Sequence, residues 1–137
     1  MTEPRWTPVV KDKLLNAPVD TLWAKVIDYV RGPRKLKIEA EGNWQYDLGK
    51  QCGPDGKPTE GFSDDNLHKA ALRGCLIAKI GGCAGDTPGS EKIFAVGSFS
   101  IFETGDVSGS LFVSINDDPK SFNKHSSKLK ITVSEAP

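Results

Sequence analysis

The densest group of polar side chains lies in one loop near the C-terminus, between residues 116 and 127. It contains two consecutive carboxylates, Asp117 and Asp118, followed by the oxygen-bearing residues Ser121 and Asn123. These groups accept hydrogen bonds, so the chemistry expected of the loop is binding through oxygen atoms. The run Asn116-Asp117-Asp118-Pro119 is also a strong turn sequence in any protein, and turn formation remains the alternative interpretation.

Two predicted strands position this loop. Apolar residues alternate with polar or aromatic ones over residues 109–115 and again, more regularly, over residues 128–133, which is the period of a strand with one face in a core. The residues expected in the core are Leu111, Val113, Ile115, Leu129, Ile131 and Val133. Loops held between strands are common functional positions in all-β proteins.

The rest of the chain predicts further short strands. Apolar segments at 9–15, 36–40, 72–80, 93–96 and 99–102 are separated by turns rich in Gly and Pro, of which the chain has 14 and 9. This pattern favours an all-β fold, a small jelly roll or β-sandwich. A short helical turn is expected near residues 63–71, with Ser63-Asp64-Asp65-Asn66 as its cap. Residues 19–30 fit an amphipathic helix by periodicity and a strand by composition, and both readings stay open.

Length and charge limit the classes of function. The 137 residues fit one domain, 1–137, and 18 basic residues balance 18 acidic ones. A zero net charge argues against a nucleic-acid-binding protein. No apolar run approaches the length needed to span a bilayer. The N-terminal residues show no hydrophobic signal region, so a cytoplasmic location is favoured.

Catalytic signatures are weak. Cys52, Cys75 and Cys83 show no CxxC spacing, so reduced thiols are favoured over a metal site, although one disulfide among them stays open. Neither histidine, His68 or His125, lies in a recognised nucleophile motif. The glycine pair 81–82 lacks the Lys-Ser/Thr of a phosphate-binding loop. We therefore expect no enzymatic activity.

Three segments resemble the galactophilic calcium-dependent bacterial lectins of the LecA (PA-IL) type. They are Gly53-Pro54-Asp55-Gly56, the run from Gly74 to Gly81, and Ser108-Gly109-Ser110-Leu111 continuing to Ile115-Asn116-Asp117. Their order and spacing also match, and the likeness runs with gaps from about Trp23 to Val133. The resemblance implies a jelly-roll sandwich of the galactose-binding type, in which one calcium bridges loop residues and sugar hydroxyls. It also favours the strand reading of residues 19–30.

Position by position, the resemblance implies a set of binding residues. Tyr46 would offer its carbonyl to calcium and its ring to the sugar, Asp117 would bind both calcium and a sugar hydroxyl, and Ser121 would bind calcium through its carbonyl. Glu60 takes the place of a sugar-contacting glutamine, and Lys57 that of a sugar-contacting histidine. The implied carbohydrate-binding residues are Tyr46, Glu60, Asp117, Asp118, Ser121 and Lys124, and the implied metal ligands are Tyr46, Asp117, Ser121 and Asn123.

Two substitutions set this chain apart from the family pattern. The two consecutive asparagine ligands fall at Lys124 and His125. Calcium needs about 6–8 oxygen ligands. Lys124 supplies none and adds a positive charge, while His125 offers a nitrogen better suited to transition metals. Asp118 and Asn123 would compensate only if the loop shifted its register. The calcium site is therefore expected to be degenerate.

Two functions follow. The first is a lectin-like domain that binds a glycan with a terminal galactose-type sugar, with or without calcium. The alternative is the same fold without its metal site, acting as a protein-interaction or assembly domain. Self-association into a homo-oligomer is compatible with both.

Overall fold

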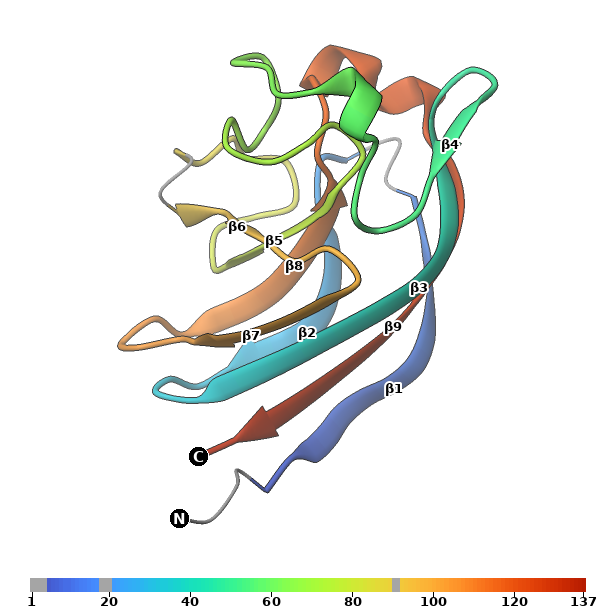
Figure 1. Cartoon of the computed structure of the whole chain (residues 1–137). Coiled ribbons are helices and arrows are strands. Elements are labelled where there is room, and N and C mark those ends of the chain that lie inside the picture. Colours follow the sequence, from blue (N-terminus) through green and yellow to red (C-terminus); the bar gives the residue numbers. More distant parts are fainter. Residues whose placement is uncertain (1–4, 18–20, 90–91) are drawn as a thin grey trace.

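Two antiparallel sheets pack face to face in the computed structural model, which describes residues 5–17, 21–89 and 92–137 (Figure 1). One sheet has the order β1-β9-β3-β4, with β7 also paired to β3, and the other has the order β2-β8-β5-β6. This arrangement confirms the all-β sandwich. None of the helical segments in these ranges is long and apolar enough to cross a membrane. The elements are β1 (Thr7–Asn16), β2 (Ala24–Val30), β3 (Lys35–Asp47), β4 (Lys50–Cys52), η1 (Pro58–Glu60), β5 (Leu76–Ile80), β6 (Phe94–Ala95), β7 (Phe99–Glu103), β8 (Gly109–Ile115), η3 (Pro119–Lys124) and β9 (Ser126–Ala136).

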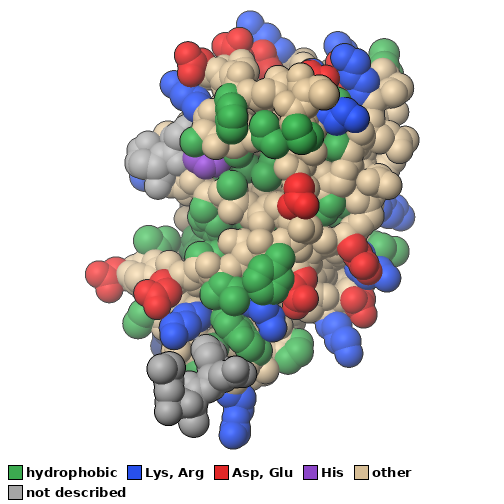
Figure 2. Space-filling view, viewed as in Figure 1, with side chains coloured by type: hydrophobic (Ala, Val, Ile, Leu, Met, Phe, Trp, Pro, Cys, Tyr) green, Lys and Arg blue, Asp and Glu red, His purple; other side chains and the backbone are tan. Residues whose placement is uncertain are grey.

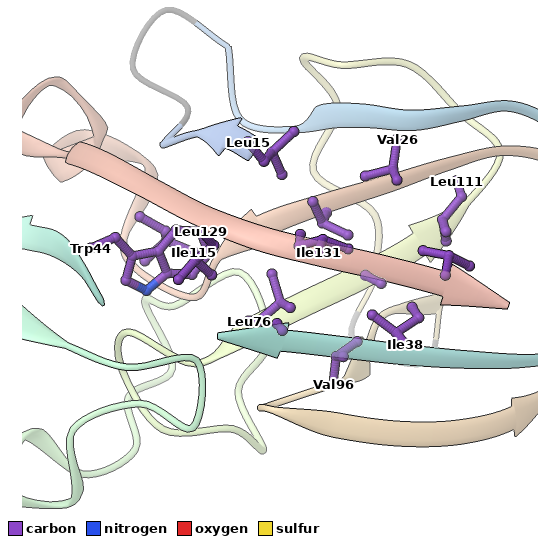
Figure 3. Close-up of a cluster of buried hydrophobic side chains, with 14 of the residues drawn as sticks. Leu15, Val26, Ile38, Trp44, Leu76, Val96, Leu111, Ile115, Leu129 and Ile131 are labelled. Carbon is purple, nitrogen blue, oxygen red and sulfur yellow. The ribbon is translucent and has the colours of Figure 1, made fainter. Parts of the chain in front are cut away.

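The main core lies between the two sheets. All six residues predicted for it from β8 and β9 are fully buried. Figure 3 shows Ile115 of β8 and Leu129 of β9 packed beside Trp44 of β3, with Leu76 and Ile38 also in the cluster. The alternation of apolar residues along the strands therefore identified the inner faces correctly.

The outer face of β8 is also buried, which the alternation did not predict. Phe112 is 5% exposed and Ser114 is fully buried. Long connections cover this face and form a second apolar cluster, because they bring their own large side chains over β5 and β8. Its members are Trp23, Leu67, Ala71, Cys75, Ile77, Ile93, Phe112 and Phe122.

The strand reading of residues 19–30 is correct over β2. This strand pairs antiparallel with β8 from Ala24 opposite Val113 to Val30 opposite Gly109, with two register shifts. Val26 and Val30 are buried in the main core. The helical periodicity was misleading because the register shifts break the simple alternation of a strand. The N-terminal part of the segment, including Val19 and Asp20, lies outside the described residues.

The helical turn expected over 63–71 is absent; the segment forms separate turns instead. The buried side chain of Asn116 forms hydrogen bonds with backbone groups of this segment, which a helical turn would otherwise use for its own hydrogen bonds. Asn116 Oδ1 accepts from the amide of His68 at 2.8 Å, and its Nδ2 donates to the carbonyls of His68 and Ala71, both at 2.9 Å, and of Leu72 at 3.1 Å. One side chain at the end of β8 thus organises the loop that leads to β5.

Replacing this side chain tests its role. Asn116→Ala leaves several buried backbone groups without a partner, so we expect the free energy of unfolding to fall by about 3 kcal/mol. Urea unfolding monitored by tryptophan fluorescence measures the change. Asn123→Ala, at an exposed position of η3, is the matched control. Equal stability of the two variants would contradict the role assigned to Asn116.

Candidate functional site

The predicted binding loop meets three other segments at one end of the sandwich, at the top of Figure 1. These are the end of β3 with the turn into β4, the short helix η1, and the residues just before β5. A charged cluster forms where these segments converge. Its centre is a residue that the sequence did not indicate, Arg73.

Arg73 binds three carboxylates that come from three different segments. Its Nε donates to Asp117 Oδ1 at 2.8 Å, and its terminal nitrogens donate to Glu60 Oε1 at 3.2 Å and to Asp47 Oδ2 at 3.4 Å. The planar guanidinium has five N–H donors in a fixed geometry, which suits simultaneous binding of several carboxylates. The side chain is 20% exposed, so the cluster has an open side.

Tyr46 supports this cluster from beneath. The Arg73 Cζ lies 5.0 Å from the centre of the tyrosine ring, within the range of a cation–π contact. The hydroxyl of Tyr46 donates to Glu60 Oε2 at 3.1 Å. Tyr46 itself is only 1% exposed, so its ring packs under Arg73 and has no open face for a sugar.

The backbone around Arg73 is fixed by contacts with Gly74. The indole Nε1 of Trp44 donates to the carbonyl of Gly74 at 3.0 Å, and the amide of Gly74 donates to the carbonyl of Asn116 at 2.7 Å. Gly74 has a φ of +88°, and a Cβ there would lie 2.5 Å from the Sγ of Cys52. Only glycine fits this position. The direction of Arg73 is therefore set by the fold.

Asp117 is almost fully engaged by protein groups. Its Oδ1 accepts from Arg73 and from the amide of Asp118 at 2.8 Å, and its Oδ2 lies 2.9 Å from Nε2 of His125. The side chain is 2% exposed. The ring of His125 is buried and packs against Phe122, with ring centres 4.3 Å apart. Asp117 thus connects Arg73 to the buried pair of rings formed by His125 and Phe122.

The other predicted loop residues lie further from the centre. Asp118 caps η3 by accepting from the amide of Lys120 at 3.0 Å, the turn role considered for it from the sequence. The amide of Ser121 donates to the carbonyl of Asp118, and Asn123 is exposed. Lys124 is half-exposed, with its Nζ 3.8 Å from Asp47 Oδ1. It lies at the rim, on the side of Asp47.

Hydrogen bonds, opposite charges and burial within the cluster shift the pKa values of its members. The amide of Leu48 and the nearby cations lower the pKa of Asp47, outweighing its desolvation. Burial raises the pKa of Glu60, but hydrogen bonds from Tyr46 and Arg73 more than offset it and hold the pKa below its ordinary value. Burial opposes the charge on Arg73, yet Asp117 and Glu60 raise its pKa overall. Burial and the bond to Glu60 raise the pKa of Tyr46 to about 12.

The donor set does not fit calcium. The carboxylates nearest to one another are already bonded to a guanidinium, and the ring at position 125 offers nitrogen rather than oxygen. Within residues 5–17, 21–89 and 92–137, no group of three or more His, Cys, Asp or Glu side chains is arranged to hold a metal ion. Calcium binding through Tyr46, Asp117, Ser121 and Asn123 stays a prediction, and the Arg73 geometry weighs against it.

The three cysteines are free thiols. Burial raises the pKa of Cys52 and of Cys75 to about 11, so both are protonated and inert at neutral pH. This agrees with the reduced thiols favoured from the sequence. Cys83 is exposed.

Sequence reasoning missed two members of the site, Arg73 and Asp47. Arg73 is the one charged residue between Leu72 and Ala78, inside an apolar run that predicts a strand. An isolated arginine at the start of such a run is a usable signal, because a charge there needs a partner. Asp47 ends β3 immediately before the turn at Leu48 and Gly49, a position where aspartate is ordinarily read as a turn residue.

Comparison with known proteins supports the fold. No protein-family model matches the sequence, and no curated protein matches it. A solved structure described as the EclA N-terminal domain, a PllA-like lectin, is similar with a TM-score of 0.62 and 15% sequence identity, covering 89% of this chain and 94% of that one. At this identity the likeness establishes a shared all-β, lectin-like fold. The closer resemblance to the LecA type stays a prediction.

Removing the central cation tests whether it holds the cluster together. Arg73→Met leaves Asp117 buried without its main partner, and we expect a loss of about 3 kcal/mol in the free energy of unfolding at pH 7. Arg31→Met, at an exposed position, is the control and is expected to change stability little. Chemical denaturation measures both, and an unchanged Arg73→Met would contradict the central role of the guanidinium.

The same cluster predicts that the folded chain loses stability in acid. The folded-state pKa values of Asp47 and Glu60 are lowered, so their stabilisation is present above the pKa of the unfolded chain, about 4, and is lost as the pH falls through the folded values. We expect the free energy of unfolding to fall between about pH 5 and pH 3. The fall should be smaller in Arg73→Met, which lacks the cation. An identical pH profile in both proteins would exclude this explanation.

Proposed function

We propose that this chain is a non-enzymatic carbohydrate-binding domain that binds a neutral, polyhydroxylated sugar at the Arg73 cluster. The observation that carries the proposal is the partly exposed guanidinium of Arg73 held between Asp47, Glu60 and Asp117. The shared fold with a PllA-like lectin supports the same class of function. A terminal galactose-type sugar is the first ligand to test, because the sequence resembles galactophilic lectins.

The exposed atoms of the cluster suit hydroxyl groups. Asp47 and Glu60 are each 23% exposed and can accept from a hydroxyl, while Arg73 and the rim lysines, Lys50 and Lys124, can donate to one. Together with Asp117, these residues carry three negative and three positive charges. Because the charges balance, the site favours an uncharged ligand with both donors and acceptors, and a sugar has both.

Two exposed apolar residues that lie close in sequence to the cluster are the proposed surface for the C–H face of a sugar ring. Leu48 and Phe62 are 73% and 66% exposed, and they follow Asp47 and Glu60 closely in the chain. Pockets for small ligands combine such apolar walls with a few fixed polar groups. In this proposal Phe62, and not the buried Tyr46, offers the aromatic ring to the sugar.

No metal takes part in this proposal. In the family that the sequence resembles, calcium supplies positive charge among the loop carboxylates. Here the guanidinium of Arg73 supplies that charge, and it also keeps Asp47 and Glu60 fixed before a ligand arrives. Fixed polar groups bind with less loss of conformational entropy than mobile ones.

A glycan array followed by calorimetry in buffer with EDTA tests the proposal. Asp47→Asn and Glu60→Gln each weaken a hydrogen bond to a charged group, worth about 1.5–3 kcal/mol, so affinity should fall roughly 10- to 100-fold. Glu41→Gln, at an exposed position of β3 that pairs with Lys130, is the control with no expected change. An array without any bound glycan would refute carbohydrate binding, and equal affinity in all three variants would place the sugar elsewhere.

A further inference from the structure

The open edges of the two sheets differ in how they are protected against pairing with another chain. Exposed edges are normally guarded by bulges, prolines, lysines or short length. β1 has two register shifts and carries Pro8, Lys11 and Lys13. β2 also has two register shifts and carries Lys25. β4 and β6 contain only three and two residues.

β7 has none of these protections. It pairs with β3 over five consecutive residues, Phe99 to Glu103, without a register shift, and contains neither lysine nor proline. Phe99 and Ile101 are 56% and 51% exposed. Figure 2 shows hydrophobic side chains gathered on the face where β7 lies in Figure 1.

The outer edge of β7 has hydrogen-bonding groups that point away from β3. The amide of Ala40 donates to Ser98, and the amide of Thr104 donates to Arg34, both at 2.9 Å. In an antiparallel pair, hydrogen-bonded residues alternate with non-bonded ones.

Ser100 and Phe102 therefore direct their backbone groups to β3. The amides and carbonyls of Phe99, Ile101 and Glu103 face outward, where no strand pairs with them in the described parts of the chain.

The start of β7 is held rigidly. Asp55, in the turn before η1, accepts from the amide of Ser98 at 2.8 Å and from its hydroxyl at 3.1 Å. A fixed, extended edge can pair with another strand without first losing much conformational entropy.

We propose that β7 pairs antiparallel with β7 of a second copy of this chain, centred on Ile101. This register joins the two five-stranded sheets into one continuous sheet. Ile101 lies opposite Ile101 of the second copy, and Phe99 lies opposite its Glu103. The three outward-facing residues of each strand then form about six backbone hydrogen bonds.

The strand is complementary to itself in charge and polarity. Like charges opposite each other destabilise a strand pair. In the proposed register the only charged residue of β7, Glu103, meets Phe99 of the other copy, so no like charges face each other, and Lys35 lies opposite Glu103 on β3. At the two-fold axis Ile101 packs beside Ile101 of the second copy, and Phe99 packs beside Glu103 of the second copy. This match favours a second copy over an unrelated partner.

The pairing would place two candidate sites, one from each chain, in a single dimer. It is independent of whether those sites bind sugar, and it gives the protein-interaction alternative a definite surface. Because five residues per strand bury less area than a standard interface, the dimer should be weak and concentration-dependent.

Sedimentation velocity over roughly 1 μM to 1 mM tests the proposal. The wild-type chain should shift from monomer to dimer, and Ile101→Lys should raise the dissociation constant at least about tenfold, a change of about 1.4 kcal/mol. Leu14→Lys, on the protected strand β1 and 61% exposed, is the matched control and should behave as wild type. A wild-type monomer at every concentration, or equal weakening by both variants, would overturn the proposal.

A crosslink tests the register without adding a charge. Directly opposite, hydrogen-bonded residues have Cα atoms about 5.5 Å apart, within the range that a disulfide spans. Ile101→Cys in a Cys83→Ser background should therefore form a covalent dimer under oxidation, reversed by reductant. Leu14→Cys in the same background should stay monomeric. Efficient crosslinking through position 14, or none through position 101, would refute this pairing.

Discussion

The guanidinium of Arg73, bonded to three carboxylates, holds together the segments that meet at one end of the sandwich. Asp47, Glu60 and Asp117 belong to three different segments of the chain, and each is bonded to Arg73. Without a cation between them, these carboxylates would repel one another, since two unit charges about 4 Å apart cost about 4 kcal/mol at an effective dielectric of 20. The positive charge of Arg73 is covalently part of the chain, so the cluster forms whenever the protein folds.

The position of Arg73 depends in turn on the core. Trp44 is fully buried between the sheets, and its indole nitrogen holds the carbonyl of Gly74. Asn116, at the end of β8, holds both the amide of Gly74 and the loop that precedes it. The core of the sandwich thereby fixes the backbone beside Arg73 through hydrogen bonds that involve the indole of Trp44 and both the carbonyl and the side chain of Asn116. Close by, Asp55 forms a β-bridge with Cys75 and fixes the start of the unprotected edge strand through Ser98.

The sequence predicted the strands well and the site only in part. Alternation over 109–115 and 128–133 identified the core because each strand has an inner face, and the resemblance placed Tyr46, Glu60 and Asp117 together, as the structure does. It did not reveal Arg73, because the cation pairs only with residues that are distant in sequence. The buried Lys79, inside the apolar run of β5, was also missed: its partner Asp86 is only seven residues away but lies in a loop that local patterns do not place. Side-chain pairing across loops needs three-dimensional information.

In the proposed site, Arg73 takes the place of a bound cation. The most direct measurement is the melting temperature of the wild-type chain, first in EDTA and then with increasing calcium up to millimolar concentration. If the guanidinium already neutralises the carboxylates, the melting temperature stays constant throughout. A ligand present at 100 times its dissociation constant stabilises by about 2.7 kcal/mol, so a saturable rise of several degrees would show that the folded chain binds calcium and would contradict this proposal.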